Sequence, residues 1–355
     1  PRSRPPRSSR RTTTTTAGRS TVPRTLAADV EVTRADVVES RHFVHAAVVG
    51  ANDALEATAR DASLVTMWRS CAKPFQVLPF LASGGFDQLG WGTEELALAC
   101  ASHGGEPEHV ALAGRMLDAI GLEQGDLACG PHEPLSTRGA RLAREFGTPL
   151  SRLHNNCSGK HAAMLARAFT SGWATQGYER ADHQVQRSCV AEVASWSGVP
   201  LDDMALGVDG CGVVVMGLPL DRMATAYARW ARAVQAGEEH PARTAAAIRA
   251  HPHLLGGADR FDTVLIEETG GRVISKVGAE GVHCAAVPEL GLGVTIKVED
   301  GAIRAQHIAL LRVLQLIGVL DDPLPGRLAD WNRRPLRNTR GEVVGELRAA
   351  GTARA

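Results

Sequence analysis

Apolar residues alternate with polar ones near both ends of the chain, whereas in its middle they recur every three to four residues. A two-residue period is typical of a strand with one buried face, and a period near 3.6 is typical of an amphipathic helix. The alternating segments predict strands at residues 29–38, 42–50, 55–59, 271–278, 281–290 and 293–305, the last with a hairpin turn at Asp300-Gly301. The helical segments are residues 93–103, 106–121, 182–198, 220–234 and 308–320.

The order of these elements predicts an α/β protein of the α+β type. Strands come first, helices follow, and strands return before a closing helix. The two ends of the chain are therefore expected to share one sheet, with a helical region between them. Residues 1–26 lack such a pattern and are rich in Arg and Thr, so we assign them to a disordered tail. Residues 27–355 contain no repeat or linker and are expected to form a single domain.

Composition and charge narrow the choice of partner. The chain has 39 Lys plus Arg and 39 Asp plus Glu, so its formal net charge is zero. A neutral chain has no general attraction for nucleic acid or for an anionic membrane surface. No apolar run approaches the roughly 18 residues that a membrane-spanning helix needs. We therefore expect a protein that contacts neither nucleic acid nor membrane.

The cysteines predict a reducing compartment. Seven cysteines are spread along the chain without a C-x-x-C pair. A chain of 355 residues buries enough core to fold without disulfides, so free thiols are expected. The Arg-rich start also lacks the apolar segment of a secretory signal. These features predict a cytoplasmic protein.

Lysine is scarce in this chain, which makes each lysine informative. Only Lys73, Lys160, Lys276 and Lys297 occur, and every other residue of the Lys plus Arg total is Arg. Arg stays charged at any working pH, whereas a buried Lys can lose its proton and act as a base. The first three lie in unusual local sequences, while the alternation around Lys297 predicts an ordinary solvent-facing strand residue.

The segment RSCAKP, residues 69–74, places the hydroxyl of Ser70 three residues before the amine of Lys73. Pro74 is tolerated only in the first turn of a helix, so a helix should begin here, where side chains three residues apart can face each other. A neutral Lys73 would then accept the proton of Ser70. A capping serine beside a surface lysine is the alternative. Lys276, which opens a K-x-G triplet after an apolar strand, favours the catalytic interpretation.

Two cysteines lie in small-residue segments that allow close approach of a ligand. Cys157 precedes Lys160 by three residues in NNCSGKHAAML, and Cys211 lies between glycines in VDGCG. Two thiols with an amine or imidazole nearby can hold Zn²⁺ or supply a reactive thiolate. Two buried structural cysteines are the alternative, and spacing does not decide between these interpretations.

A third polar segment, CASHGGE at residues 100–106, ends an apolar helix with Ser102 and His103. Such an exit can present a hydroxyl, although a glycine-capped helix end is the simpler interpretation. The chain has no P-loop, no GxGxxG after a strand, no HExxH and no GxSxG, so it lacks those nucleotide-binding and hydrolase signatures.

Five segments occur together in one order: RSCAKPFQ, ASHGGE, HNNCSGKHAAML, VDGCG and SKVGAEGV. On these motifs the chain resembles, over about residues 28–350, the bacterial L-asparaginase II family of the thermolabile, rhizobial type. The family's fold is related to serine β-lactamases and penicillin-binding proteins, which implies a central, mainly antiparallel sheet flanked by helices. The S-D-N element of β-lactamases is absent, which argues against β-lactam chemistry.

The resemblance implies two tandem Ser–Lys pairs in one site. Ser70 with Lys73 matches one pair, and Ser102 with Lys276 matches the second. Either serine could be the nucleophile, and we expect Ser70 to attack with neutral Lys73 as its base. The chain departs from the family pattern at Phe43-Val44, where an Arg-Gly pair is usual, near the expected site.

The resemblance also implies a metal and a set of substrate contacts. Cys157, Lys160 and Cys211 match an unusual zinc site in which a lysine amine is a ligand, and the zinc would order the substrate pocket. The positions expected to contact or orient the substrate are Arg69, His161 and Asp209.

The implied activity is hydrolysis of the side-chain amide of L-asparagine to aspartate and ammonia by a cytoplasmic homodimer. Two alternatives remain at this point. One is a serine amidohydrolase that acts on glutamine or a small peptide, and the other is a catalytically silent relative that binds an amino acid or zinc.

Overall fold

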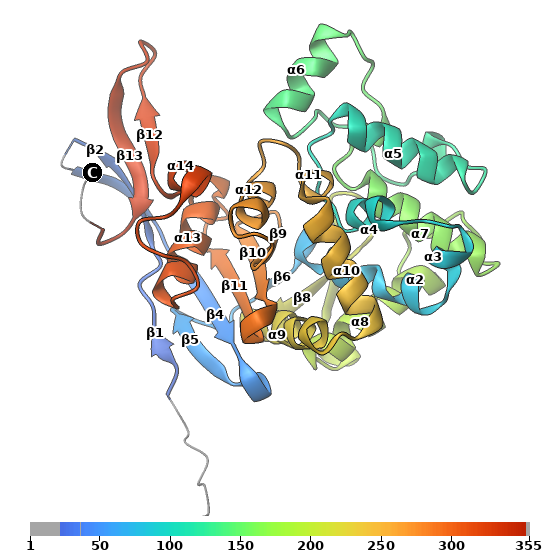
Figure 1. Cartoon of the computed structure of the whole chain (residues 1–355), viewed down its shortest axis with the longest axis horizontal. Helices are drawn as coiled ribbons and strands as arrows, with labels where there is room; N and C mark the ends of the chain where they lie inside the picture. The colour runs from blue at the N-terminus through green and yellow to red at the C-terminus, as the bar shows by residue number, and fades with distance from the viewer. Residues whose placement is uncertain (1–21, 36, 353–355) are drawn as a thin grey trace, which may run out of the picture.

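Three sheets and a set of helices make up the computed structural model, which describes residues 22–35 and 37–352. The largest sheet has the strand order β1 (Arg24–Thr25), β5 (Leu55–Ala59), β4 (Val44–Val49), β11 (Leu292–Val298), β10 (Val282–Val287) and β9 (Ile274–Val277). Its neighbouring strands are antiparallel except for β1 with β5. The predicted α+β class with a mainly antiparallel central sheet is confirmed, and strands from both ends of the chain share this sheet (Figure 1).

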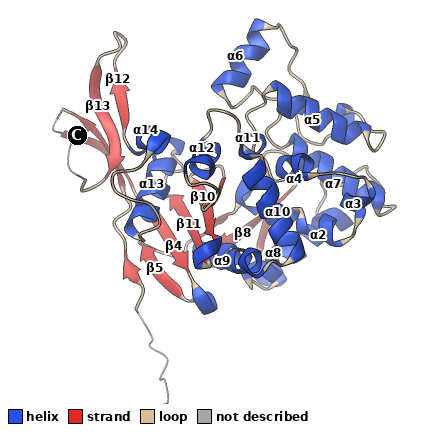
Figure 2. Ribbon diagram, viewed as in Figure 1, coloured by secondary structure: helices blue, strands red, loops and turns tan. Residues whose placement is uncertain are grey.

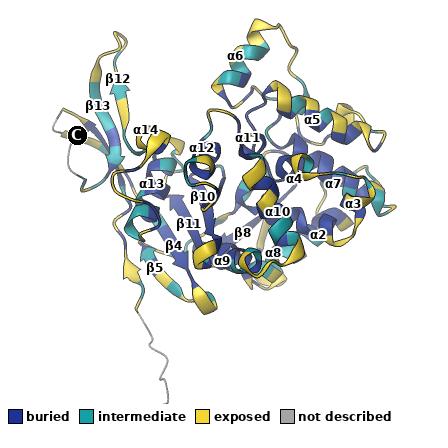
Figure 3. Ribbon diagram, in the orientation of Figure 1, coloured by how far each residue is buried: buried dark blue, intermediate teal, exposed yellow. Residues whose placement is uncertain are grey.

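Helices cover both faces of this sheet (Figure 2). Because side chains alternate along a strand, Val48 packs into the apolar cluster around α13 (Ile303–Leu316), while Val49 packs into the cluster around α9 (Leu220–Ala236). Gly293 of β11 lets α9 approach closely, since a Cβ there would lie 2.1 Å from a backbone carbonyl oxygen of α9. The central strands are consequently buried from both sides (Figure 3).

Two smaller sheets complete the strand framework. One has the order β12 (Arg334–Arg337), β13 (Val343–Ala349), β2 (Val30–Arg34) and β3 (Val37–His42). The other has the order β6 (Val65–Met67), β8 (Val214–Pro219) and β7 (Ala205–Val208). The first again joins the two ends of the chain, through two strands, β12 and β13, that lie after the last predicted element.

The middle of the chain is helical, as predicted, and lies to the right of the large sheet in Figure 1. Its helices up to β7 are α1 (Lys73–Gln76), α2 (Leu78–Ala82), α3 (Gly85–Gln88), α4 (Thr93–Ala99), α5 (Pro107–Asp118), α6 (Thr137–Glu145), α7 (Ser158–Thr170) and α8 (Gln184–Ser197). After α9 follow α10 (Glu239–Ala250), α11 (Pro252–Leu255) and α12 (Phe261–Glu268), and α14 (Ala329–Asn332) precedes the last strands.

Several boundaries differ from the predicted ones. The predicted strand 29–38 is two antiparallel strands, β2 and β3, with a turn at Ala35, whose φ is 46°. Asp300-Gly301 makes no hairpin, because the chain turns there directly into α13, whose side-chain pattern had predicted a start only at residue 308. The prediction that Lys297 faces solvent is wrong: it is buried in the large sheet, and its amine donates hydrogen bonds to the backbone carbonyls of the two residues that follow it.

The predicted tail, residues 1–26, is only partly described. Arg24 and Thr25 pair with β5 and Leu26 is buried, so these residues belong to the fold. Residues 1–21 lie outside the described residues, and the single domain 27–355 stays a prediction. Within residues 22–35 and 37–352, no helix combines the length and the apolar character needed to cross a membrane. All seven cysteines are buried free thiols.

Candidate active site

Ser102 lies where the chain leaves α4 and passes between the helical region and the large sheet. Its backbone N–H donates to the carbonyl of Leu255 at 3.0 Å, which ties this exit to the end of α11. Two glycines follow, and Gly105 has a φ of 71°, a conformation that favours glycine. The local sequence therefore presents Ser102 on a loop that is held in place by backbone contacts.

Two buried lysines converge on the Ser102 hydroxyl. Nζ of Lys276, on edge strand β9, lies 2.8 Å from Oγ of Ser102, and Nζ of Lys73, at the start of α1, lies 3.1 Å from the same oxygen. Each lysine is 1% exposed and Ser102 is 3% exposed. A hydroxyl that contacts two amines away from bulk water can lose its proton to whichever amine is neutral.

The environment of Lys276 favours its neutral form. Burial, followed by repulsion from the charge of Lys73, lowers the pKa of Lys276 to about 8, and the charge of Asp262 opposes this shift only in part. An amine with a pKa near the working pH can both accept and return a proton.

Ser70 lies in the same site but is not paired with Lys73. The 3₁₀ turn Arg69–Ala72 leads into α1, and the Lys73 side chain points inward to the Ala101 carbonyl and Ser102. Ser70 stays half-buried on the cavity wall, and its hydroxyl makes no side-chain hydrogen bond with the described residues. The contact expected from the three-residue spacing is thus replaced by a contact with a serine distant in the sequence.

Arg69, before Ser70, takes an unusual backbone conformation. Its φ of 54° lies in the left-handed region, where a residue with a Cβ is strained. Its Nε donates to Oδ1 of Asp209 at 2.7 Å, so these two predicted substrate-contacting residues form an ion pair. Against the effect of burial, the charges of Lys160 and Arg69 lower the pKa of Asp209.

The two candidate cysteines and Lys160 form a second cluster next to the first. Nζ of Lys160 lies 3.0 Å from Sγ of Cys211, and Nζ of Lys73 lies 3.2 Å from Sγ of Cys157. A hydrogen bond from Cys157 and the charge of Lys160 lower the pKa of Cys211 to about 4, against the effect of burial, so Cys211 is the thiolate of the pair.

The donor atoms of this cluster limit which groups could hold a zinc ion. Among the described residues, no three His, Cys, Asp or Glu side chains gather into a metal-ligand group. Any zinc site here therefore depends on the sulfurs of Cys157 and Cys211 together with the Lys160 amine. Two sulfurs and one nitrogen within a buried cluster suit Zn²⁺, provided that the amine gives up its proton on binding.

His161 lies beside this cluster. Its Nδ1 is hydrogen-bonded to the hydroxyl of Tyr178 at 2.6 Å, and the same hydroxyl accepts from the backbone N–H of Ala128 at 2.9 Å. Burial, followed by the charge of Lys160, lowers the pKa of His161 to about 3. His161 is thus neutral, and its buried Nε2 has no partner among the described residues. Nothing in the local sequence singled out Tyr178.

A cavity of about 550 Å³ opens beside both clusters. The candidate residues on its wall are Arg69, Ser70, Ser102, Cys157, Asp209 and Cys211. Lys73, Lys160, His161 and Lys276 lie buried behind this wall. The Phe43-Val44 departure is not part of the wall, because Phe43 packs under Arg60, 4.2 Å from ring centroid to guanidinium carbon, and Val44 lies in the core.

Asp262, in the first turn of α12, is a functional candidate that the sequence did not reveal. Its carboxylate accepts from Oγ of Ser275 at 2.7 Å, from the backbone N–H of Val277 at 2.8 Å and from Nε2 of His283 at 2.8 Å. Despite burial, the contacts with His283 keep the pKa of Asp262 well below its usual range. Asp262 therefore holds β9 on both sides of Lys276.

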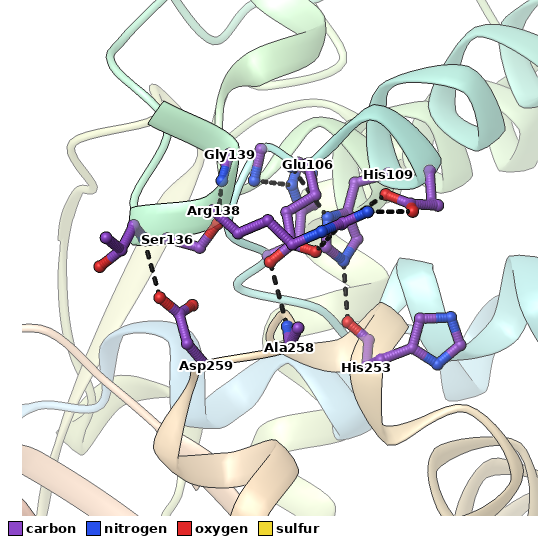
Figure 4. A network of polar contacts seen from close by, with 12 residues as sticks. Glu106, His109, Ser136, Arg138, Gly139, His253, Ala258 and Asp259 are labelled. Atoms are coloured by element: carbon purple, nitrogen blue, oxygen red, sulfur yellow. Dashed lines mark hydrogen bonds and ion pairs between the residues drawn. The ribbon is translucent and has the colours of Figure 1, made fainter. Parts of the chain in front are cut away.

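A polar network joins the Ser102 loop to two neighbouring segments (Figure 4). Glu106, four residues after Ser102, is buried and accepts hydrogen bonds from the Arg138 guanidinium and from the backbone N–H of Ala258 at 3.0 Å. Arg138 belongs to α6, and Ala258 to the loop before α12. His109 Nε2 also bonds the His253 carbonyl at 2.8 Å. The loop that carries Ser102 is thus held between α6 and the 256–260 loop.

Comparison with known proteins adds an independent observation. The family model described as L-asparaginase II matches residues 30–349 of the 355-residue chain. A comparison with curated proteins gave no match. The matched span contains every candidate residue of the two clusters and of the cavity wall.

Proposed function

The chain belongs to the L-asparaginase II family, and on that premise we propose that it hydrolyses the side-chain amide of L-asparagine to aspartate and ammonia. The observation that carries this proposal is the contact of one buried hydroxyl, Ser102, with two buried amines on the wall of a cavity. Such a group suits acyl transfer, in which a hydroxyl attacks a carbonyl carbon.

In the proposed reaction Ser102 is the nucleophile and Lys276 its base. Oγ of Ser102 bonds to the amide carbon as its proton passes to Nζ of Lys276, 2.8 Å away. Lys276 then returns this proton to the leaving nitrogen, which departs as ammonia. Water next attacks the acyl-serine, gives a proton to Lys276 and releases aspartate, after which the proton returns to Ser102. Lys73 holds the Ser102 oxygen from its other side.

Ser70 and Lys73 form the second candidate pair of the family pattern. The half-buried position of Ser70 on the cavity wall supports a role in binding the substrate amide or the attacking water. The Arg69–Asp209 ion pair, on the same wall, would orient the amino-acid part of the substrate, and His161, buried behind this wall, would help to orient it.

We also propose a zinc ion held by Cys157, Lys160 and Cys211. When bound, zinc would supply a fixed positive charge beside the cavity and join the start of α7 to the turn that precedes β8. The homodimer implied by the family and the cytoplasmic location expected from the free cysteines stay predictions.

Single substitutions of the two serines test the choice of nucleophile. We expect Ser102→Ala to lower kcat for ammonia release from L-asparagine by at least about 1,000-fold, as loss of a nucleophile does. Ser70→Ala should retain measurable turnover, because another hydroxyl performs the attack. A coupled ammonia assay with asparagine and glutamine measures both variants and the substrate preference.

The reverse result would reassign the roles. If Ser70→Ala abolishes turnover while Ser102→Ala stays within about tenfold of the parent, Ser70 is the nucleophile. If the parent binds asparagine but releases no ammonia, the chain is a silent relative and the proposed function fails.

A further inference from the structure

Arg260 is a guanidinium on the cavity wall that has no acidic partner. It is half-buried, and its only side-chain hydrogen bond among the described residues is from Nη1 to the Leu135 carbonyl at 3.2 Å. Arg69, another arginine of the same wall, is by contrast paired with Asp209 at 2.7 Å. Among the described residues, the Arg260 guanidinium therefore has no direct ion-pair partner, and the charges of Asp262, Asp259 and Glu106 act on it only without contact.

Acidic groups occur near Arg260, but each is already engaged. Asp262 accepts the three hydrogen bonds that hold β9. Glu106 is paired with Arg138, and Asp259 accepts the backbone N–H of Thr137 at 3.0 Å. Burial lowers the pKa of Arg260, and the charges of Asp262, Asp259 and Glu106 oppose this shift only in part. An anionic ligand in the cavity could therefore form an ion pair with the Arg260 guanidinium.

Arg260 is also close to Ser102 through the backbone. The Ser102 N–H bonds the Leu255 carbonyl, and Gly256 follows directly. A Cβ built on Gly256 would lie 3.1 Å from Cβ of Arg260, so the arginine packs over this glycine and reaches across to Leu135. The guanidinium thus connects the 256–260 loop to the segment before α6, and it lines the same cavity as Ser102.

We propose that Arg260 binds the α-carboxylate of the amino-acid substrate and thereby sets the side-chain amide against Ser102. This inference rests on the proposed function. In asparagine the carboxylate carbon is three bonds from the amide carbon, which is about 4 Å at full extension. A planar guanidinium matches a carboxylate with two parallel hydrogen bonds, which fixes both distance and orientation. The site would therefore select α-amino acids with a free carboxylate.

The test compares two substrates in the full-length protein. L-Asparagine carries the carboxylate, and 3-aminopropanamide is the same molecule with hydrogen in its place. Arg260→Met should lower kcat/KM for asparagine by about 10- to 100-fold, mainly through KM, because a charge-assisted contact is lost. The value for 3-aminopropanamide should change by less than about threefold.

Two further variants guard against a general structural effect. Arg249→Met removes an arginine that, within the described part of the chain, likewise bonds only a backbone carbonyl, that of Gly271, away from the cavity, and it should match the parent. Arg260→Lys keeps the charge without the planar fork, so its KM for asparagine should fall between those of the parent and the Met variant. Equal losses for both substrates, or an unchanged KM for asparagine in Arg260→Met, would overturn the inference.

A binding measurement distinguishes failure of the proposed function from failure of the inference about Arg260. If the parent releases no ammonia, calorimetric titration with L-aspartate still reports on the carboxylate contact. Binding to the parent that weakens by about tenfold or more in Arg260→Met upholds the inference. Aspartate that binds both proteins equally, or neither, overturns it.

Discussion

A lysine amine can give up its proton where an arginine guanidinium cannot, and this difference has its clearest consequence at Ser102. Lys73 and Lys276 approach one oxygen from two elements, and burial together with mutual repulsion lowers the pKa of Lys276 to about 8. The chain uses Arg for nearly all its basic residues. The two lysines beside Ser102 therefore indicate a site whose chemistry needs an amine that can lose its proton and act as a base.

The pKa of Lys276 predicts the pH dependence of the reaction. Below pH 8 the amine is protonated and cannot accept the proton of Ser102, so kcat/KM should fall about tenfold for each pH unit below the pKa. Above pH 8 the rate should level off. Initial rates of ammonia release across about pH 6 to pH 9 measure this pH dependence. Ser70→Ala leaves Lys276 in place, so this variant should show the same fall in kcat/KM at acidic pH. A profile that is flat down to about pH 6 would exclude Lys276 as the base.

At the scale of elements, the position of Lys276 depends on how an edge strand is held. Among the described residues β9 pairs with one strand, β10, and it is also held by the Cys71 thiol, which bonds the Lys276 carbonyl, and by the Asp262 carboxylate of α12. That carboxylate binds Ser275 and Val277, the residues on either side of Lys276, and it also binds His283 on β10. The helix therefore fixes the strand on which the amine stands.

Asp262→Asn should show this positioning role in two measurements. The amide cannot replace all three acceptor contacts of a buried charge, so the free energy of unfolding should fall by about 3 kcal/mol. Because the Asp262 charge raises the pKa of Lys276, its removal should move the acidic limb of kcat/KM to lower pH. Denaturant unfolding and the pH–rate profile check these outcomes.

A surface carboxylate supplies the matched control. Asp87→Asn breaks the exposed pair with Arg243 and should leave both stability and the pH profile close to those of the parent. An acidic limb that stays in place, or moves to higher pH, in Asp262→Asn would show that Asp262 does not act through Lys276.

At the scale of the whole molecule, the candidate site lies where separate parts of the fold meet. The large sheet supplies Lys276, the helical region supplies Lys73 and Ser102, and the turn before β8 supplies Cys211. The network of Figure 4 connects the Ser102 loop, α6 and the 256–260 loop. The geometry of the site therefore depends on how these parts pack together.

The proposed zinc would add one more connection between the parts. We expect elemental analysis of the purified protein to find about one zinc per chain, and a chelator to lower the melting temperature, because an ion bound only by the folded state stabilises it. Cys157→Ser should lose the metal. Cys100→Ser, another buried cysteine outside the cluster, should retain it. Zinc-free protein with an unchanged melting temperature after chelation would contradict this site.

The sequence by itself determined the classes and order of the longer elements, because hydrophobic period is a local property of the chain, but it did not predict the short strands β1, β6 and β7 or the late strands β12 and β13. Alternation predicted the strands of the sheet, and the 3.6-residue period predicted helices such as α5 and α8. It also singled out Lys73, Ser102 and Lys276 through local composition, and the resemblance placed them in one site. The spacing of residues indicates only which side chains are close along the chain, and on that basis it predicted a contact between Ser70 and Lys73.

Only the tertiary structure decided which groups touch. Lys73 and Ser102 are 29 residues apart, and Lys276 and Ser102 are 174 apart, so their contacts depend on the packing of β9 against the helical region. The burial of Lys297 and the role of Asp262 depend on the same long-range packing. A side chain's pKa and its partners are set by the surfaces that fold against it, and local pattern does not contain that information.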